Sequence, residues 1–175
     1  MTRVWRANGE EAGVVAGLLT EFRDWMGRSR PTAQSLAASV ERLMEDPDTE
    51  YLLGRPEGRE APAGVCQLRF RYGVWHAATD CWLEDLFVRE DSRACGLGSA
   101  LVEKAVERAR QRGCARVELD VNEANGPALA LYEGFGFSAS TKAPGGKDLL
   151  MRLMLPEDPG AGARGRAIRS SPRRP

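Results

Sequence analysis

Two glycines that follow a short apolar segment are the first residues of this sequence whose type and spacing could support chemistry. They are Gly96 and Gly98, and residues 101–112 after them show apolar side chains three and four positions apart. Glycine has no Cβ, so backbone N–H groups can converge on a ligand there. The amphipathic pattern predicts a helix, whose first turn carries unpaired N–H groups and the positive end of the helix dipole. The segment therefore predicts a site for a phosphate-bearing ligand.

Two common nucleotide-binding motifs do not fit this segment. A dinucleotide-binding turn has the pattern G-x-G-x-x-G, but the third glycine position is occupied by Leu101. A phosphate-binding loop of nucleotide kinases needs a lysine between its last glycine and the following Ser or Thr, whereas Gly98 precedes Ser99 directly. The ligand is therefore expected to be a different kind of phosphate ester.

The elements that position this segment follow from the period of the apolar residues. We expect helices over residues 8–27, 31–46, 101–112 and 127–133, and the loop after the first of them could border a substrate pocket. Alternation or short apolar runs predict strands over residues 3–7, 50–54, 64–72, 81–88, 115–121, 135–138 and 149–155. The strand before the glycines and the strand at 115–121 should pair in parallel through a right-handed crossover.

Composition indicates a globular protein with one folded domain over residues 1–155. The chain has 175 residues, 42% hydrophobic and 29% charged, and its formal net charge is zero. No bulk charge favours nucleic acid, and no apolar run is long enough to span a membrane. Four cysteines without a CxxC pair and a single histidine give no basis for a metal site. A reduced, cytoplasmic setting without a secretory signal is expected.

The last twenty residues differ sharply from the rest. Residues 156–175 are rich in glycine, proline and arginine and almost lack large apolar side chains. Such a segment cannot bury enough surface to offset its ordering entropy, so we expect a flexible tail. Its arginines could instead contact nucleic acid, which is the less favoured interpretation.

Two sequence blocks together resemble the GNAT superfamily of N-acetyltransferases. The first matches the family pattern Arg/Gln-x-x-Gly-x-Gly/Ala after a strand that ends in valine, and its residues are Arg93, Ala94, Cys95, Gly96, Leu97 and Gly98. The second matches Asn-x-x-Ala-x-x-Leu-Tyr-x-x-x-Gly-Phe, and it runs from Asn125 through Ala128 and Tyr132 to Phe137. The blocks have the family's order and spacing, and the likeness covers residues 3–155.

The resemblance implies a fold and a co-substrate. The fold is α/β (α+β), with a mixed, twisted central sheet of about seven strands, about four flanking helices, and a gap where strands 4 and 5 splay apart. Acetyl-coenzyme A would lie in this gap and carry the activated acyl group. Its pantetheine arm would pair with the backbone of Leu86, Phe87 and Val88. Its pyrophosphate would accept hydrogen bonds from the N–H groups of residues 93–99, Ser99 included.

The reaction that the resemblance implies needs an acid and a base. An alkyl ammonium with a pKa of about 10.4 must lose a proton before it attacks a thioester, so a base near it would accelerate the reaction. Glu84 matches the family's base and Asp85 is the alternative, since strand alternation puts Glu84 on the face of Leu86 and Val88. A structural ion pair is the other interpretation of Glu84. Tyr132 matches the residue that donates a proton to the departing thiolate.

Other residues have both functional and structural interpretations. Asn125 would bind the pantetheine amide, cap the following helix, or do both. His76 could line the mouth of the substrate pocket, while Trp75 and Trp82 could face either substrate or core. The acceptor amine is open: a polyamine, an antibiotic, an amino acid or a protein N-terminus. A homodimer is a family expectation, and a non-catalytic module that senses acyl-coenzyme A is the alternative function.

Overall fold

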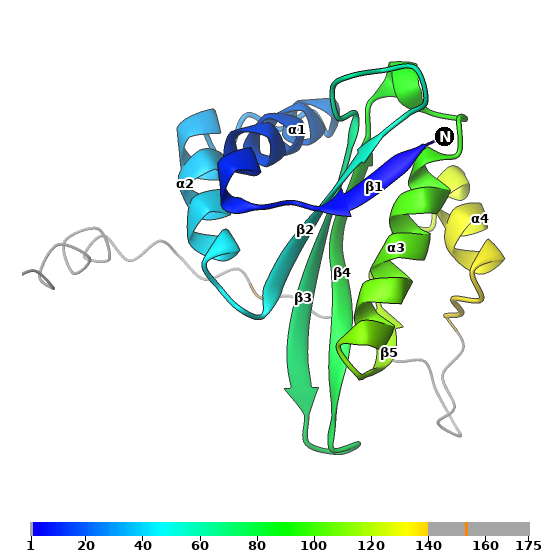
Figure 1. Cartoon of the computed structure of the whole chain (residues 1–175). Helices are drawn as coiled ribbons and strands as arrows, with labels where there is room; N and C mark the ends of the chain where they lie inside the picture. The colour runs from blue at the N-terminus through cyan, green and yellow to red at the C-terminus, as the bar shows by residue number, and fades with distance from the viewer. Residues whose placement is uncertain (1, 140–152, 154–175) are drawn as a thin grey trace, which may run out of the picture. The chain divides into compact units, whose positions relative to one another are not determined.

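Five strands form a mixed sheet in the part of the chain that the computed structural model describes, residues 2–139 and 153 (Figure 1). The strands lie side by side in chain order, the first three pairs antiparallel and the last pair parallel. They are β1 (Arg3–Arg6), β2 (Thr49–Arg55), β3 (Gly64–Gly73), β4 (Ala78–Val88) and β5 (Cys114–Glu118). The predicted mixed α/β sheet and its parallel strand–helix–strand unit are confirmed.

Within the described residues the sheet has five strands rather than the expected seven or so, and the chain directly after the fourth helix turns rather than extends. Helix α4 (Gly126–Gly134) ends with Gly136 at φ +86°, a left-handed conformation that suits glycine. The N–H groups of Gly136 and Phe137 donate back to the carbonyls of Glu133 and Tyr132 at 2.9 and 3.1 Å. These bonds close the helix end, so the strand predicted at 135–138 is wrong. The strand predicted at 149–155 and the tail lie outside the described residues, apart from Leu153.

Helices cover both faces of the sheet (Figure 1). On one face lie α1 (Ala12–Trp25), which follows the short 3₁₀ turn η1 (Gly9–Glu11), and α2 (Ala33–Met44). On the other lie α3 (Leu97–Gln111), preceded by the 3₁₀ turn η2 (Glu90–Ser92), and α4. Asn8 and Thr32 cap η1 and α2 through their side chains. None of the helices in the described residues is long and apolar enough to cross a membrane.

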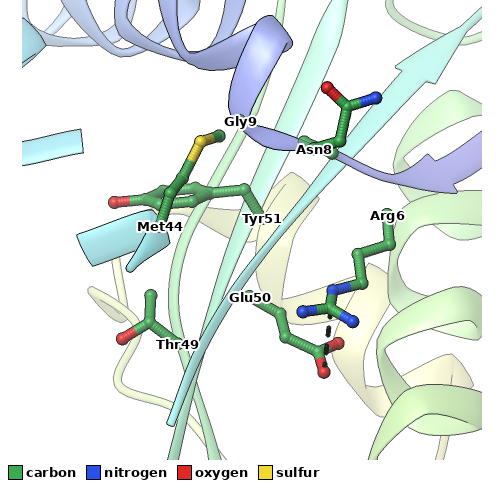
Figure 2. A pocket seen from close by; sticks show the side chains of 8 residues that line it. Arg6, Asn8, Gly9, Met44, Thr49, Glu50 and Tyr51 are labelled. Atoms are coloured by element: carbon green, nitrogen blue, oxygen red, sulfur yellow. Dashed lines mark ion pairs between the residues drawn. The ribbon is translucent and has the colours of Figure 1, made fainter. Parts of the chain in front are cut away.

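Alternation along β2 sends neighbouring side chains to opposite faces, as Figure 2 shows for Glu50 and Tyr51. Glu50 is buried and accepts hydrogen bonds from Arg108 of α3 at 2.7 and 2.8 Å and from Arg112 at 3.3 Å. Burial alone would raise the pKa of Glu50, but these arginines hold it below its ordinary value. The Glu50 carboxylate therefore attaches α3 to the sheet, and both of its oxygens accept hydrogen bonds from arginines.

Strands β4 and β5 separate halfway along β4. Their pairing runs from Thr79↔Cys114 to Trp82↔Glu118, and residues 83–88 of β4 continue without a β5 partner. Because the pairing stops there, the edge of β4 exposes backbone N–H and C=O groups. This confirms the predicted splay of the fourth and fifth strands.

A β-bulge lies where the open half of β4 begins. Gln67 of β3 pairs with Asp85 and Leu68 pairs with Leu83, so Glu84 is the extra residue on β4. Leu83 and Leu86 consequently pack into the same core on the α3 face, which uninterrupted alternation would forbid. Leu86 and Phe87 lie on opposite faces as predicted, but the bulge interrupts the alternation that we used to place Glu84.

Candidate active site

A cleft of about 1020 Å³ lies where β4 and β5 part. Its walls come from the end of α1, the open half of β4, the loop before α3, the segment after β5, and α4. Many of the residues predicted from sequence line this one cleft: Glu84, Leu86, Phe87, Val88, Arg93, Ala94, Gly98, Asn125, Ala128 and Tyr132. The fold thus brings together two blocks that are about thirty residues apart in the chain.

The loop before α3 is shaped to present backbone N–H groups. Ala94 has φ +58° and Gly96 has φ +81°, so the chain turns sharply twice before the helix. Helix α3 begins at Leu97, earlier than predicted, and its first bonded N–H group is that of Ala100, which donates to the Gly96 carbonyl at 3.0 Å. Residues 97–99 therefore have no acceptor within the helix, and their N–H groups are available to an anion.

Side chains of this loop seat the helix or leave room for a ligand. Leu97 is buried and packs so closely on the sheet that a Cβ at Gly54 would lie 2.7 Å from its Cδ1 atom. A Cβ at Gly98 would meet nothing nearer than Leu131 Cδ2, at 3.6 Å. Cys95 is exposed and its thiol donates to the Ser92 carbonyl at 3.0 Å. Cys95, Gly96, Leu97 and Ser99 do not line the cleft, and their predicted contacts through backbone N–H groups stay predictions.

Glu84 reaches the cleft from the β-bulge. Its side chain is 44% exposed and forms a long ion pair with Arg69, whose Nη1 lies 3.9 Å from Oε2. A bulge re-aims the side chain that it carries, so Glu84 points where a regular strand would not put it. The ion pair with Arg69 is long and solvated, which leaves the carboxylate able to accept a proton from a ligand in the cleft.

Tyr132 lies at the opposite wall and is buried. Phe137 packs against its ring with centroids 5.7 Å apart, so the turn after α4 holds the side chain in place. Burial, with smaller contributions from Cys66 and Asp120, raises the pKa of Tyr132 to about 12. Within the described residues its hydroxyl forms no hydrogen bond. The phenol is therefore a protonated donor at any physiological pH.

Asn125 has the capping role that we expected as one of its two interpretations. Its Oδ1 atom accepts a hydrogen bond from the backbone N–H of Ala128 at 3.3 Å, which caps α4. Asn125 also lines the cleft. The cap uses only Oδ1, so the amide nitrogen can still contact a ligand.

Residues at the end of α1 form a wall that sequence reasoning did not identify residue by residue. Phe22, Trp25, Met26 and Arg28 line the cleft, as does Asp120 beyond β5. Arg93 lies over the Trp25 ring, with Cζ 4.9 Å from the centroid, and its Nε donates to the Val88 carbonyl at 3.0 Å. Trp25 and Met26 are exposed at this helix end, but the sequence carries no specific signal for them, because their spacing also fits a helix face packed on a sheet.

The histidine and the tryptophan of the β3–β4 turn do not line the cleft. Trp75 is 94% exposed at this turn. His76 lies 3.1 Å from Asp80 through its Nε2 atom, and this contact belongs to the hairpin. The structure therefore does not place His76 at the mouth of the substrate pocket.

Comparison with known proteins yields several matches. The chain is 33% identical over 92 residues to thialysine N-ε-acetyltransferase of Bos taurus, which covers 53% of each protein. It is 31% identical over 104 residues to a putative [ribosomal protein bS18]-alanine N-acetyltransferase of Bacillus subtilis, covering 59% of this chain and 60% of that protein. The chain thus spans between half and two thirds of the length of these curated relatives.

Solved structures agree with the fold. A putative acetyltransferase from Arthrobacter sp. FB24 superposes with a TM-score of 0.77 at 30% identity, covering 87% of this chain and 96% of that one. The aminoglycoside N-acetyltransferase AAC(6')-Iy in complex with CoA has a TM-score of 0.71 at 13% identity, covering 89% of this chain and 95% of that one, and shows the fold alone. The family model described as Acetyltransferase (GNAT) family matches residues 15–137. This chain therefore belongs to the GNAT acetyltransferase family.

Proposed function

We propose that this protein is an N-acetyltransferase that moves an acetyl group from acetyl-coenzyme A to a small primary amine. The observation that carries the proposal is the cleft itself, which joins an unpaired strand edge, a loop rich in free N–H groups, a carboxylate and a buried phenol. Two relatives at 31–33% identity are named as N-acetyltransferases, one of thialysine and one, putatively, of an alanine in a ribosomal protein. Homodimerisation and a cytoplasmic location are further predictions of the same family likeness.

The residues present fit acetyl-coenzyme A as a substrate. The open edge of β4 at residues 86–88 can pair with an extended amide-bearing chain as another strand would. The N–H groups at the start of α3 can donate to a pyrophosphate, and Gly98 keeps the approach clear of side-chain atoms. When bound, this substrate supplies an acetyl group activated as a thioester. The chain's own residues then position the amine and manage the proton.

Glu84 is proposed as the general base. An alkyl ammonium with a pKa of about 10.4 is almost fully protonated at pH 7, so a proton must leave the nitrogen before it attacks. Glu84 would accept this proton, directly or through one water. The nitrogen lone pair then forms a bond to the thioester carbonyl carbon. The carbon–sulfur bond breaks, the acetyl group stays on nitrogen, and the sulfur leaves as a thiolate with the bonding electron pair.

Tyr132 is proposed to stabilise this thiolate. A thiol has an ordinary pKa of about 8.5, whereas that of Tyr132 is raised to about 12. Full proton transfer to the thiolate would therefore be uphill by about 3.5 pKa units, or about 5 kcal/mol. We therefore favour hydrogen-bond donation from the phenol to the sulfur, with the final proton coming from solvent. Tyr132→Phe should lower kcat about tenfold and leave the KM for acetyl-coenzyme A unchanged.

The test is thiol release from acetyl-coenzyme A in the presence of a panel of amines that includes monoamines, diamines, amino acids and an aminoglycoside. We expect amine-dependent release and a mass increase of one acetyl group on at least one amine. Calorimetric titration of coenzyme A into the same protein provides the control. Binding of coenzyme A without acetylation of any amine would instead identify a non-catalytic sensing module and reject the proposal.

A further inference from the structure

Three polar side chains form a row across the middle of the sheet. Tyr51 of β2 lies directly opposite Gln67 of β3, which lies directly opposite Asp85 of β4. Two positions further along, Leu53, Val65 and Phe87 pack into the core under α1 and α2, so the row shares that face. Figure 2 shows the Tyr51 ring beside Met44 of α2, turned away from Glu50 and Arg6.

Two of the three residues in the row are buried, and Asp85 is half-buried. Gln67 is 5% exposed and Tyr51 is 2% exposed. Within residues 2–139, no hydrogen bond forms to the Gln67 amide, the Tyr51 hydroxyl or the Asp85 carboxyl group. Buried polar groups in folded proteins nearly always have a hydrogen-bond partner. Glu50, the chain neighbour of Tyr51 on the other face, follows that rule with its arginines. The polar atoms of the row form no hydrogen bond within the described residues and are not fully enclosed, so they can bind a ligand.

The charge around the row selects a cation. Glu84 adjoins Asp85 in the chain, and Asp120 lies near enough to add its charge. Burial first, and then these two carboxylates, raises the pKa of Asp85 to about 6, so the group is still mainly ionised above pH 7. Arg69 is the neighbouring cation in the described residues, and it is shared between Glu84 at 3.9 Å and Asp46 at 3.8 Å. Among the described residues, the side chains around the row therefore carry a net negative charge.

The row begins next to the proposed reaction centre. Glu84 lines the cleft, and Asp85 follows it at the start of the row on the α1 face. Neighbouring strands lie about 4.8 Å apart, so Gln67 is about 5 Å and Tyr51 about 10 Å further from β4. A ligand with one nitrogen at Glu84 would thus place a group several bonds away beside Asp85 and Gln67.

We propose that Asp85 binds a second, non-reacting ammonium group of the acceptor, and that the acceptor is a small diamine. Gln67 accepts from the same ammonium through its amide oxygen, and Tyr51 orients that amide from behind. This inference rests on the proposed acetyltransferase activity and assigns the two adjacent acids different roles: Glu84 takes the proton, and Asp85 holds the other end of the substrate.

The experiment compares 1,5-diaminopentane with 1-aminopentane, which differ only in the second amine, at pH 8. For the unchanged protein we expect kcat/KM to be at least thirtyfold higher for the diamine. Asp85→Asn should raise the KM for the diamine at least tenfold, change kcat less than threefold, and leave the monoamine unaffected. Gln67→Leu should raise the KM for the diamine about threefold to tenfold. Glu118→Gln, which removes a carboxylate outside the cleft, should leave kcat/KM unchanged for both amines.

Calorimetric titration of coenzyme A into each variant checks that the fold is intact, and titration of 1,5-diaminopentane into the coenzyme A complex measures the ammonium site without turnover. Equal kcat/KM for the two amines, with activity intact, would overturn the inference and leave the acetyltransferase function standing. Loss of kcat for both amines in Asp85→Asn would overturn it too, since Asp85 would then be the base. If coenzyme A binds but no amine is acetylated, the proposed function itself fails.

Discussion

The two sides of the cleft are built in different ways. The side proposed to hold the phosphates comes from one contiguous stretch, residues 93–99, and its ligands are backbone N–H groups that a left-handed turn and a helix start expose. The side proposed to hold the amine extends beyond the lining of the cleft to side chains on three strands, Tyr51, Gln67 and Asp85, which only the sheet register brings together. A site made of backbone groups depends on one local stretch of sequence. A site made of side chains on several strands depends on how segments that are distant in the sequence pair in the sheet.

The largest effect should come from Glu84, which lies between the two sides. Glu84→Gln removes the proposed base without changing the size of the side chain, so kcat should fall about 10²–10⁴-fold. Affinity for coenzyme A should be unchanged, because no phosphate contact is altered. Steady-state rates and calorimetry measure the two quantities. Glu107→Gln, an exposed acid that pairs with Lys104 on α3, is the matched control. Retention of full turnover in Glu84→Gln at pH 6 would remove Glu84 as the base.

A change on the phosphate side should separate that side from the amine side. Gly98→Val adds branched side-chain atoms at a position where a Cβ would fit in ordinary contact with Leu131, at 3.6 Å. We expect the KM for acetyl-coenzyme A to rise about 10- to 100-fold because the added atoms block approach of the pyrophosphate to the N–H groups, while the KM for the amine stays constant. Gly17→Ala, in open space on α1, should affect neither KM. An equal rise in both KM values would contradict the division of the cleft.

The same division explains what the sequence could reveal. The glycine loop, the helix after it, the splay beyond Trp82 and the Asn125 cap were all predictable, since each depends on local residue types or on a family pattern. The bulge at Glu84 was not, because it is a mismatch between two strands and neither strand alone encodes it. For the same reason the sequence did not identify Gln67 as a site residue. Gln67 fits the alternation of an ordinary strand, and only the pairing with β2 and β4 shows that its side-chain amide has no hydrogen bond within the described residues.

The strand wrongly predicted at residues 135–138 has a local cause that could have been recognised. Apolar residues with high strand propensity surround Gly136, but a glycine just after a helix more often closes it in a left-handed turn. The edge-to-face contact between the Phe137 and Tyr132 rings completes that turn. The Phe-Gly-Phe segment therefore holds the Tyr132 side chain in place and does not form a strand of the sheet.

A smaller effect concerns Asp85 on the amine side, whose ionisation should make the free energy of unfolding depend on pH. The pKa of Asp85 is raised from 3.8 to about 6, so the native state binds this proton more tightly than the unfolded chain does. The ionised group therefore costs stability: the cost is absent below the unfolded pKa and complete above the folded one. Asp85→Asn should raise the free energy of unfolding by up to about 3 kcal/mol at pH 8 and change it little at pH 4. Denaturant titrations at both pH values measure this, and a variant that is less stable at pH 8 would show that the carboxylate has a structural partner.

The smallest effect should come from the phosphate side, where conformation matters more than side-chain chemistry. Ala94 holds φ at +58°, a region that costs a residue with a Cβ about 1 kcal/mol. Ala94→Gly should therefore raise stability by about 0.5–1 kcal/mol and keep the KM for acetyl-coenzyme A within twofold, since the N–H group stays in place. Ala77→Gly provides the matched control, because Ala77 has φ +49° in the β3–β4 turn, away from the cleft. If Ala94→Gly keeps its stability gain but loses affinity for coenzyme A, the rigidity of the loop, and not only its shape, is part of the phosphate site.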